Sequence, residues 1–251
     1  MNRTDTCQTG SDAGAHASAH QAAGHASVEP CHAATPCGRP DAASEAAPVL
    51  VSLQNVTVGY DRHPAIHHLQ LQISAGDMLA VVGPNGAGKS SILSALAGLV
   101  RSRADKAAVG GRDIGRGKHL VGYVFQNPEH QFVATTVGAE LAVGGTSQAR
   151  VDQLLQQFHL VAHRDHHPLT LSGGQARRLS VATMVSEERD VVVLDEPTYG
   201  QDWDNTCELM DFIDQLRHQG RTVIMATHDL ELALEHCTHI IALPGPTSRT
   251  R

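Results

Sequence analysis

The sequence predicts an α/β fold with a mostly parallel sheet at its core, and three observations support this. An apolar run at residues 78–82 leads into a glycine-rich loop, and an apolar helical segment follows that loop directly. A second apolar run, at residues 191–194, ends in two adjacent carboxylates, and the carboxyl ends of parallel strands are where such folds hold their ligands. Beyond it, helical and strand patterns alternate as far as residue 243, which is typical of a doubly wound sheet.

The 251 residues divide into a tail, residues 1–47, and one folded domain, residues 48–251. The tail has almost no large apolar side chains and cannot bury enough surface to offset its ordering entropy, so it is predicted to be disordered. Its histidines and cysteines leave open a transition-metal buffer, although no pair has the tight spacing of a metal motif. A passive tail, or a start codon placed too early, is the alternative.

Charge and hydropathy exclude several classes of protein. A net charge of −7, from 19 basic and 26 acidic residues, argues against a general nucleic-acid surface. No apolar run approaches the ~20 residues that a membrane span needs, and the N-terminus lacks the apolar centre of a signal peptide. The five cysteines are odd in number and irregularly spaced, which indicates reduced thiols. We expect a soluble, cytoplasmic protein.

The folded domain is predicted to begin with three strands, at residues 49–58, 68–74 and 78–82. Tyr60 follows the first strand, and its ring is predicted to stack on an adenine base, with ordinary packing in a turn as the alternative. Aromatic residues make up only 3% of the chain, which favours the stacking interpretation.

The glycine-rich loop after the third strand is the strongest motif in the chain. We call it the phosphate loop, and it reads Gly83-Pro84-Asn85-Gly86-Ala87-Gly88-Lys89-Ser90. Its glycines let consecutive backbone N–H groups close around phosphate oxygens, and the helix behind them adds the positive end of its dipole. Lys89 is predicted to reach the outer phosphates and Ser90 to ligate Mg²⁺, with Ser91 beside them in the candidate site. The phosphate loop therefore predicts a nucleoside triphosphate site.

The middle of the chain carries less chemistry. Short strands and turns are predicted for residues 101–118, and a strand at 120–125 then runs into Gln126. Two amphipathic helices follow, at residues 137–143 and 147–159. Three histidines come next, for which a solvated helix end is preferred to a metal site and no role is assigned; they are His163, His166 and His167.

Two segments in the second half carry further candidate chemistry. The first lies at the start of a helix that is predicted to reach about residue 185. The N–H groups at the start of that helix can face an anion. We call this first segment the signature segment, and it reads Leu171-Ser172-Gly173-Gly174-Gln175. In the second, Asp195 and Glu196 end a buried strand, where Mg²⁺ needs a carboxylate and an attacking water needs a base. The remaining expected elements are a helix at 204–219, a strand at 222–226 before His228, another helix, and a strand at 239–243.

From Val49 onward the chain resembles the nucleotide-binding subunit of an ABC transporter. The resemblance rests on six motifs in order, namely the phosphate loop, Gln126, the signature segment, the Asp195-Glu196 strand end, Asp202 and His228. It implies a P-loop NTPase of the ABC type, with a mostly parallel sheet core, an antiparallel β subdomain and a helical subdomain that carries the signature segment.

The resemblance implies a role for each motif residue toward ATP and Mg²⁺. Lys89 would hold the β- and γ-phosphates and Tyr60 the adenine. Glu196 would polarise the attacking water and His228 would contact the γ-phosphate. The implied metal ligands are Ser90, Asp195 and Gln126, the last of which would also join the metal site to a transport subunit.

The resemblance also implies a head-to-tail dimer. Ser172 and Gly174 of one chain would serve the ATP held by a second ATP-binding subunit, so hydrolysis requires both chains. Gly173, Gln175 and Asp202 are further candidate residues of the nucleotide site. Relatives usually continue with a further hairpin where this chain ends, which leaves dimer contacts from that region open, and the tail has no counterpart in the family pattern.

A narrower resemblance concerns the energy-coupling-factor importers, which take up vitamins and transition metals through a separate substrate-capture membrane protein. It rests on residues 125–132 and 136–144, and Gln201, where most relatives have Leu, resembles the branch linked to thiamine or its pyrimidine precursor. We therefore expect an ATPase on the cytoplasmic face of the membrane, bound to an integral transport subunit and not to nucleic acid. A soluble ATPase acting on nucleic acid or translation, and a non-hydrolysing regulatory domain, are the alternatives. The cargo, and whether the partner ATPase is a second copy or a sister chain, stay open.

Overall fold

The computed structural model describes residues 35–36, 47–60, 63–187 and 189–245 of the chain. In this part, a six-stranded sheet has the order β1-β11-β4-β10-β9-β8, and β1 is antiparallel to its neighbour while the others run parallel. Its strands are β1 (Thr35–Pro36), β4 (Met78–Val82), β8 (Val121–Val124), β9 (Val191–Asp195), β10 (Thr222–Thr227) and β11 (His239–Ala242). The mostly parallel core expected from the sequence is confirmed.

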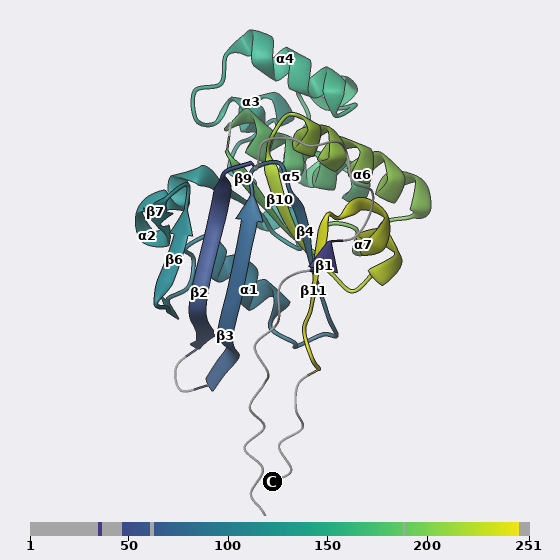
Figure 1. The fold of residues 1–251 in the computed structure, drawn as a ribbon. Coiled ribbons are helices and arrows are strands. Elements are labelled where there is room, and N and C mark those ends of the chain that lie inside the picture. Colours follow the sequence, from purple (N-terminus) through teal and green to yellow (C-terminus); the bar gives the residue numbers. More distant parts are fainter. Residues whose placement is uncertain (1–34, 37–46, 61–62, 188, 246–251) are drawn as a thin grey trace, which may run out of the picture.

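A second, antiparallel sheet has the order β3-β2-β6-β7, with β5 paired to β2. Its strands are β2 (Val49–Tyr60), β3 (His63–Ser74), β5 (Ser102–Arg103), β6 (Lys106–Val109) and β7 (Arg112–Asp113). The register between β2 and β3 shifts near Asn55 and His68, which both have positive φ angles and whose side chains meet at 2.5 Å. Bulges of this kind bend a pair of strands. Figure 1 shows β2 and β3 in front of helix α1.

Helices pack on both faces of the parallel sheet (Figure 1). The described helices are α1 (Lys89–Leu96), α2 (Ile114–Gly117), which contacts β6 and β7 of the antiparallel sheet, α3 (Val137–Ala142), α4 (Gln148–Gln157), α5 (Gly173–Ser186), α6 (Trp203–His218) and α7 (Leu230–His236). Single 3₁₀ turns are η1 (Lys118–Leu120), η2 (Pro128–His130), η3 (Val161–His163) and η4 (Pro168–Thr170). Side chains cap the helices that shape the site: Ser172 accepts from an N–H of α5, Asp202 from one of α6 and Asp229 from one of α7. Such caps satisfy N–H groups that have no partner within the helix.

The side chains of each central strand point alternately into two hydrophobic cores, one on each face of the sheet. In β4, Leu79 and Val81 pack with helix α1 and the antiparallel sheet, whereas Met78 and Ala80 pack with the helices of the opposite face. Because both faces of the sheet are covered, the sequence of each central strand is continuously apolar instead of alternating between apolar and polar residues. The register aligns Val82 with Thr227, and Asp195 with Ala226. The carboxyl ends of β4, β9 and β10 therefore meet at one edge of the sheet.

Some details differ from the prediction. Strand β3 begins at His63 rather than residue 68, because pairing with β2 continues to the end of that strand. Helix α2 was not expected; Asp113 starts it by accepting the N–H of Gly115. Within the predicted disordered tail, Thr35–Pro36 pairs with β11, and residues 1–34 and 37–46 lie outside the described residues. Among the helices that the structure describes, none is long and apolar enough to cross a membrane.

Candidate active site

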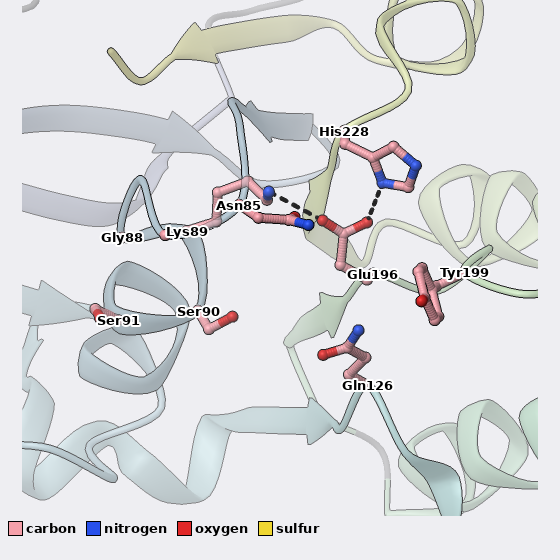
Figure 2. A pocket seen from close by; sticks show the side chains of 10 residues that line it. Asn85, Gly88, Lys89, Ser90, Ser91, Gln126, Glu196, Tyr199 and His228 are labelled. Carbon is pink, nitrogen blue, oxygen red and sulfur yellow. Dashed lines mark hydrogen bonds and ion pairs between the residues drawn. The ribbon is translucent and has the colours of Figure 1, made fainter. Parts of the chain in front are cut away.

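The carboxyl edge of the parallel sheet holds a cavity of about 460 Å³. The phosphate loop forms one wall, and residues that follow β8, β9 and β10 form the other, as Figure 2 shows. The lining residues are Asn85, Gly86, Gly88, Lys89, Ser90, Ser91, Gln126, Glu196, Tyr199 and His228. Phosphate-loop, carboxylate, amide and imidazole groups therefore face one space, although more than a hundred residues separate some of them in sequence.

The phosphate loop is shaped by glycine conformations and held by its own lysine. Gly88 is the N-cap of α1 and has a φ of 97°. Residues with a Cβ rarely adopt this left-handed backbone conformation. Gly83 packs so closely that a Cβ there would lie 3.0 Å from the carbonyl oxygen of Leu243. Lys89, which is 6% exposed, donates to the carbonyl oxygen of Gly83 at 2.8 Å. The loop is thus preorganised around a buried ammonium group.

Glu196 lies at the centre of the cavity. Its Oε1 is 3.0 Å from Lys89 Nζ, and its Oε2 is 2.9 Å from His228 Nδ1, contacts that Figure 2 draws as dashed lines. Glu196 is 6% exposed and has a φ of 47°. A non-glycine residue in this region costs about 1–3 kcal/mol and is found mostly at functional sites. The fold therefore holds this carboxylate in a strained conformation between two nitrogen groups.

Oxygen donors suited to a hard divalent cation lie beside the phosphate loop. Ser90 Oγ donates to Asp195 Oδ1 at 3.0 Å, and the phenol of Tyr123 donates to Asp195 Oδ2, also at 3.0 Å. The side chain of Gln126 faces the same cavity (Figure 2). A hydroxyl, a carboxylate and an amide oxygen form the donor set that Mg²⁺ prefers, so these residues fit that ion.

The signature segment lies outside this cavity, because none of its residues lines it. Ser172 and Gln175 form a reciprocal capping box at the start of α5, and Ser172 and Gly173 are exposed. Asp202 caps α6 and accepts from the side chain of Asn205 at 2.9 Å. These groups face outward on the surface of the same chain rather than toward its own phosphate loop.

The structure thus brings together most, but not all, of the predicted site residues. Pro84, Gly83 and Ala87 belong to the phosphate loop without lining the cavity. Asp195 joins the site through its bond with Ser90. Tyr60 is the last residue of β2, and its side chain, with the predicted adenine stacking, lies outside what the structure describes.

Three residues near the site had no predicted role. Tyr199 lines the cavity, and its ring centroid is 6.4 Å from that of His228; its place three residues after Glu196 was the available signal. Tyr123 was an ordinary strand residue in the sequence. Arg177 of α5 is buried, and burial lowers its pKa to about 10 against the opposing effect of Asp195.

Comparisons with known proteins agree with this geometry. Residues 66–199 match the family described as "ABC transporter". The chain is 41% identical over 184 residues to the "Putative HMP/thiamine import ATP-binding protein YkoD" of Bacillus subtilis, an alignment that covers 70% of this chain and 34% of that protein. It is 36% identical over 197 residues to the "Energy-coupling factor transporter ATP-binding protein EcfA" of Methanosarcina acetivorans, covering 72% of each.

Among solved structures, cbiO1 from Clostridium perfringens, described as part of the ABC transporter complex cbiONQ, superposes with a TM-score of 0.71 at 24% identity. That likeness covers 78% of this chain and 84% of the other and concerns the fold. The chain spans between a third and about half of the length of the first curated relatives that it matches. The phosphate loop, the strained carboxylate behind it, the two-sheet fold and the match over more than half of the sequence together show that the chain belongs to the ABC transporter family.

Proposed function

We propose that this chain is the ATP-hydrolysing nucleotide-binding subunit of a membrane importer. The observation that carries the proposal is the placement of Glu196 between Lys89 and His228 in the cavity beside the phosphate loop. A buried carboxylate there can accept a hydrogen bond from a water molecule aimed at the terminal phosphate. Lys89 is within reach of the outer phosphate oxygens, and charge-assisted donors of this kind are the main protein contribution to phosphoryl transfer.

Each group has a separate task in this proposal. The N–H groups of the phosphate loop and the α1 N-terminus bind the phosphates. Glu196 orients the attacking water and takes up its proton, and His228 contacts the γ-phosphate. Mg²⁺, when bound by Ser90, Asp195 and Gln126, would neutralise phosphate charge.

The site of one chain is incomplete in this proposal. The signature segment and Asp202 present exposed polar groups and the N-terminus of a 14-residue helix, yet they face no phosphate loop in their own chain. A second ATP-binding subunit placed head to tail would bring them to the nucleotide, as the family resemblance implies. An integral transport subunit would hold this pair at the cytoplasmic face of the membrane.

The importer class is the finer part of the proposal. Relatives named as energy-coupling-factor ATP-binding proteins support that type, and the YkoD relative, named for HMP and thiamine import, supports a thiamine-related cargo. Uptake of another vitamin or of a transition-metal ion is the alternative cargo. A separate substrate-capture membrane protein would then select it.

Lys89→Ala is the first test of this function. It removes the cation that faces the phosphates in both the ground state and the transition state, so we expect ATP affinity to fall about tenfold or more and turnover to be lost. Equilibrium binding of a fluorescent ATP analogue and phosphate release from Mg²⁺-ATP measure the two effects. Lys106→Ala, which removes an exposed lysine of β6, is the matched control and should change neither. A Lys89→Ala protein with unchanged ATP affinity would contradict the proposed role of the phosphate loop.

A further inference from the structure

Two side chains outside the six motifs contact the residues proposed to hold the metal. The Tyr123 phenol donates to Asp195 Oδ2 at 3.0 Å. Arg177 donates through Nη1 to the carbonyl oxygen of Phe125 at 2.7 Å and through Nη2 to the carbonyl oxygen of Gln126. Tyr123 belongs to β8 and Arg177 to α5, so different elements restrain the two proposed ligands Asp195 and Gln126.

The contacts of Asp195 leave its carboxylate little freedom to rotate. One oxygen accepts from Ser90 and the other from Tyr123, and the residue is only 6% exposed. Each carboxylate oxygen has two lone-pair sites, so Oδ1 can accept from Ser90 and still contact a cation. Without the phenol, Oδ2 would lose this donor, and the carboxylate would be freer to rotate Oδ1 away from Ser90.

Arg177 acts on the backbone of the second proposed ligand. It is 3% exposed, and burying a charged group is costly unless that group is well bonded. Both of its contacts are to consecutive carbonyl groups just beyond the end of β8, where the chain turns and directs the Gln126 side chain into the cavity (Figure 2). A second cavity of about 580 Å³ is lined by Gln126, Arg177 and Asp195 among others. The two bonds from Arg177 thus hold a backbone segment that borders both cavities.

We propose that Tyr123 and Arg177 are positioning residues for the Mg²⁺ site, Tyr123 through Asp195 and Arg177 through Gln126. The inference rests on the proposed function. It adds a physical link between the signature segment and the proposed metal site, because Arg177 lies three residues after Gly174 on helix α5 and bonds the Gln126 carbonyl oxygen. Movement of that helix would shift the Gln126 backbone directly.

The inference predicts a selective loss of metal affinity. Groups that orient metal ligands typically contribute 10–100-fold to metal affinity, so we expect Tyr123→Phe and Arg177→Lys each to weaken metal binding by about tenfold or more. Nucleotide binding without metal depends on the phosphate loop, to which neither Tyr123 nor Arg177 belongs. The affinity of each variant for nucleotide without metal should stay within about twofold of that of the unchanged protein.

The experiment uses the full chain with a non-hydrolysable ATP analogue. Analogue affinity is first measured in EDTA, and Mn²⁺ is then titrated into the nucleotide complex with free Mn²⁺ followed by electron paramagnetic resonance. Thr238→Val is the matched control, because its hydroxyl bonds Met78 at the opposite end of β4; Mn²⁺ affinity should not change. Asp195→Asn, which alters the ligand itself, sets the scale of a full loss.

The outcomes separate this inference from the function on which it rests. Weaker Mn²⁺ binding by Tyr123→Phe and Arg177→Lys, with unchanged affinity in EDTA and an unchanged melting temperature, supports the inference. Tyr123→Phe that binds Mn²⁺ like the unchanged protein, while Asp195→Asn does not, overturns it and leaves the ATPase proposal standing. An unchanged protein that binds neither nucleotide nor Mn²⁺ overturns both. Tyr123→Phe keeps the test decisive even if Arg177→Lys does not fold.

Discussion

Glu196→Gln is expected to lower the rate of ATP hydrolysis by at least about 100-fold. The substitution keeps the shape of the side chain but removes the negative charge that orients and polarises the attacking water. The Glu196 N–H donates to the carbonyl oxygen of Ala226 at 3.0 Å, a backbone contact that the substitution leaves in place. The loss should therefore arise in the chemical step rather than from a change in the fold.

The same substitution should also make ATP bind more tightly. Glu196 Oε1 lies 3.0 Å from Lys89 Nζ, so phosphate oxygens would compete with a carboxylate for the same cation. A neutral amide competes less well, because its attraction for a buried ammonium group is weaker. We expect the variant to retain ATP and to accumulate as a dimer.

Two measurements check this prediction, namely phosphate release under saturating Mg²⁺-ATP and light scattering with and without ATP. Glu231→Gln, an exposed carboxylate in the first turn of α7, is the control and should behave like the unchanged protein. Hydrolysis by Glu196→Gln at nearly the parent rate would show that Glu196 is not the catalytic carboxylate.

Gly174→Asp is expected to abolish turnover while leaving the first ATP-binding step largely intact. The residue lies in the first turn of α5, where an added carboxylate would repel phosphate held by a partner chain. The phosphate loop of the same chain is not contacted, so its ATP affinity should stay close to the parent value. Titration with a fluorescent ATP analogue and a steady-state ATPase assay measure the two properties.

A control is needed because the new side chain also meets its own subunit. A Cβ at Gly174 would lie 2.6 Å from Asn205 Oδ1, and Asn205 in turn holds Asp202. Asn205→Ala removes the group that would be struck. If turnover returns in the double variant Gly174→Asp with Asn205→Ala, the loss came from strain within the chain and not from the phosphate contact.

Local sequence patterns were enough to predict most of the residues that line the cavity. The phosphate loop and the Asp195-Glu196 pair each lie within a few residues of a buried strand, and strand ends of a parallel sheet meet at one edge. The expected strands β4, β9 and β10 were confirmed. Each could be predicted because a sheet covered on both faces requires strands that are apolar throughout.

Contacts between distant residues could not be predicted in this way. Tyr123 and Asp195 are 72 residues apart, and Arg177 reaches the Phe125 carbonyl oxygen across 52 residues. A tyrosine in a strand and an arginine in a helix are ordinary residues until packing decides what they face. The strained φ of Glu196 is likewise imposed by the tertiary fold, and helix α2 is too short, with two glycines in four residues, for its pattern to be recognised.

The most direct test of a site shared between two chains is to mix two inactive variants, Lys89→Ala and Gly174→Asp, in equal amounts. In a mixed head-to-tail dimer, the intact phosphate loop of the Gly174→Asp chain meets the intact signature segment of the Lys89→Ala chain, so one complete site is rebuilt. Random pairing then predicts ATP hydrolysis at about a quarter of the parent rate, since half of the dimers carry one working site of two. A mixture as inactive as its two components, under conditions where the unchanged protein hydrolyses ATP, would contradict a site formed between two copies of this chain.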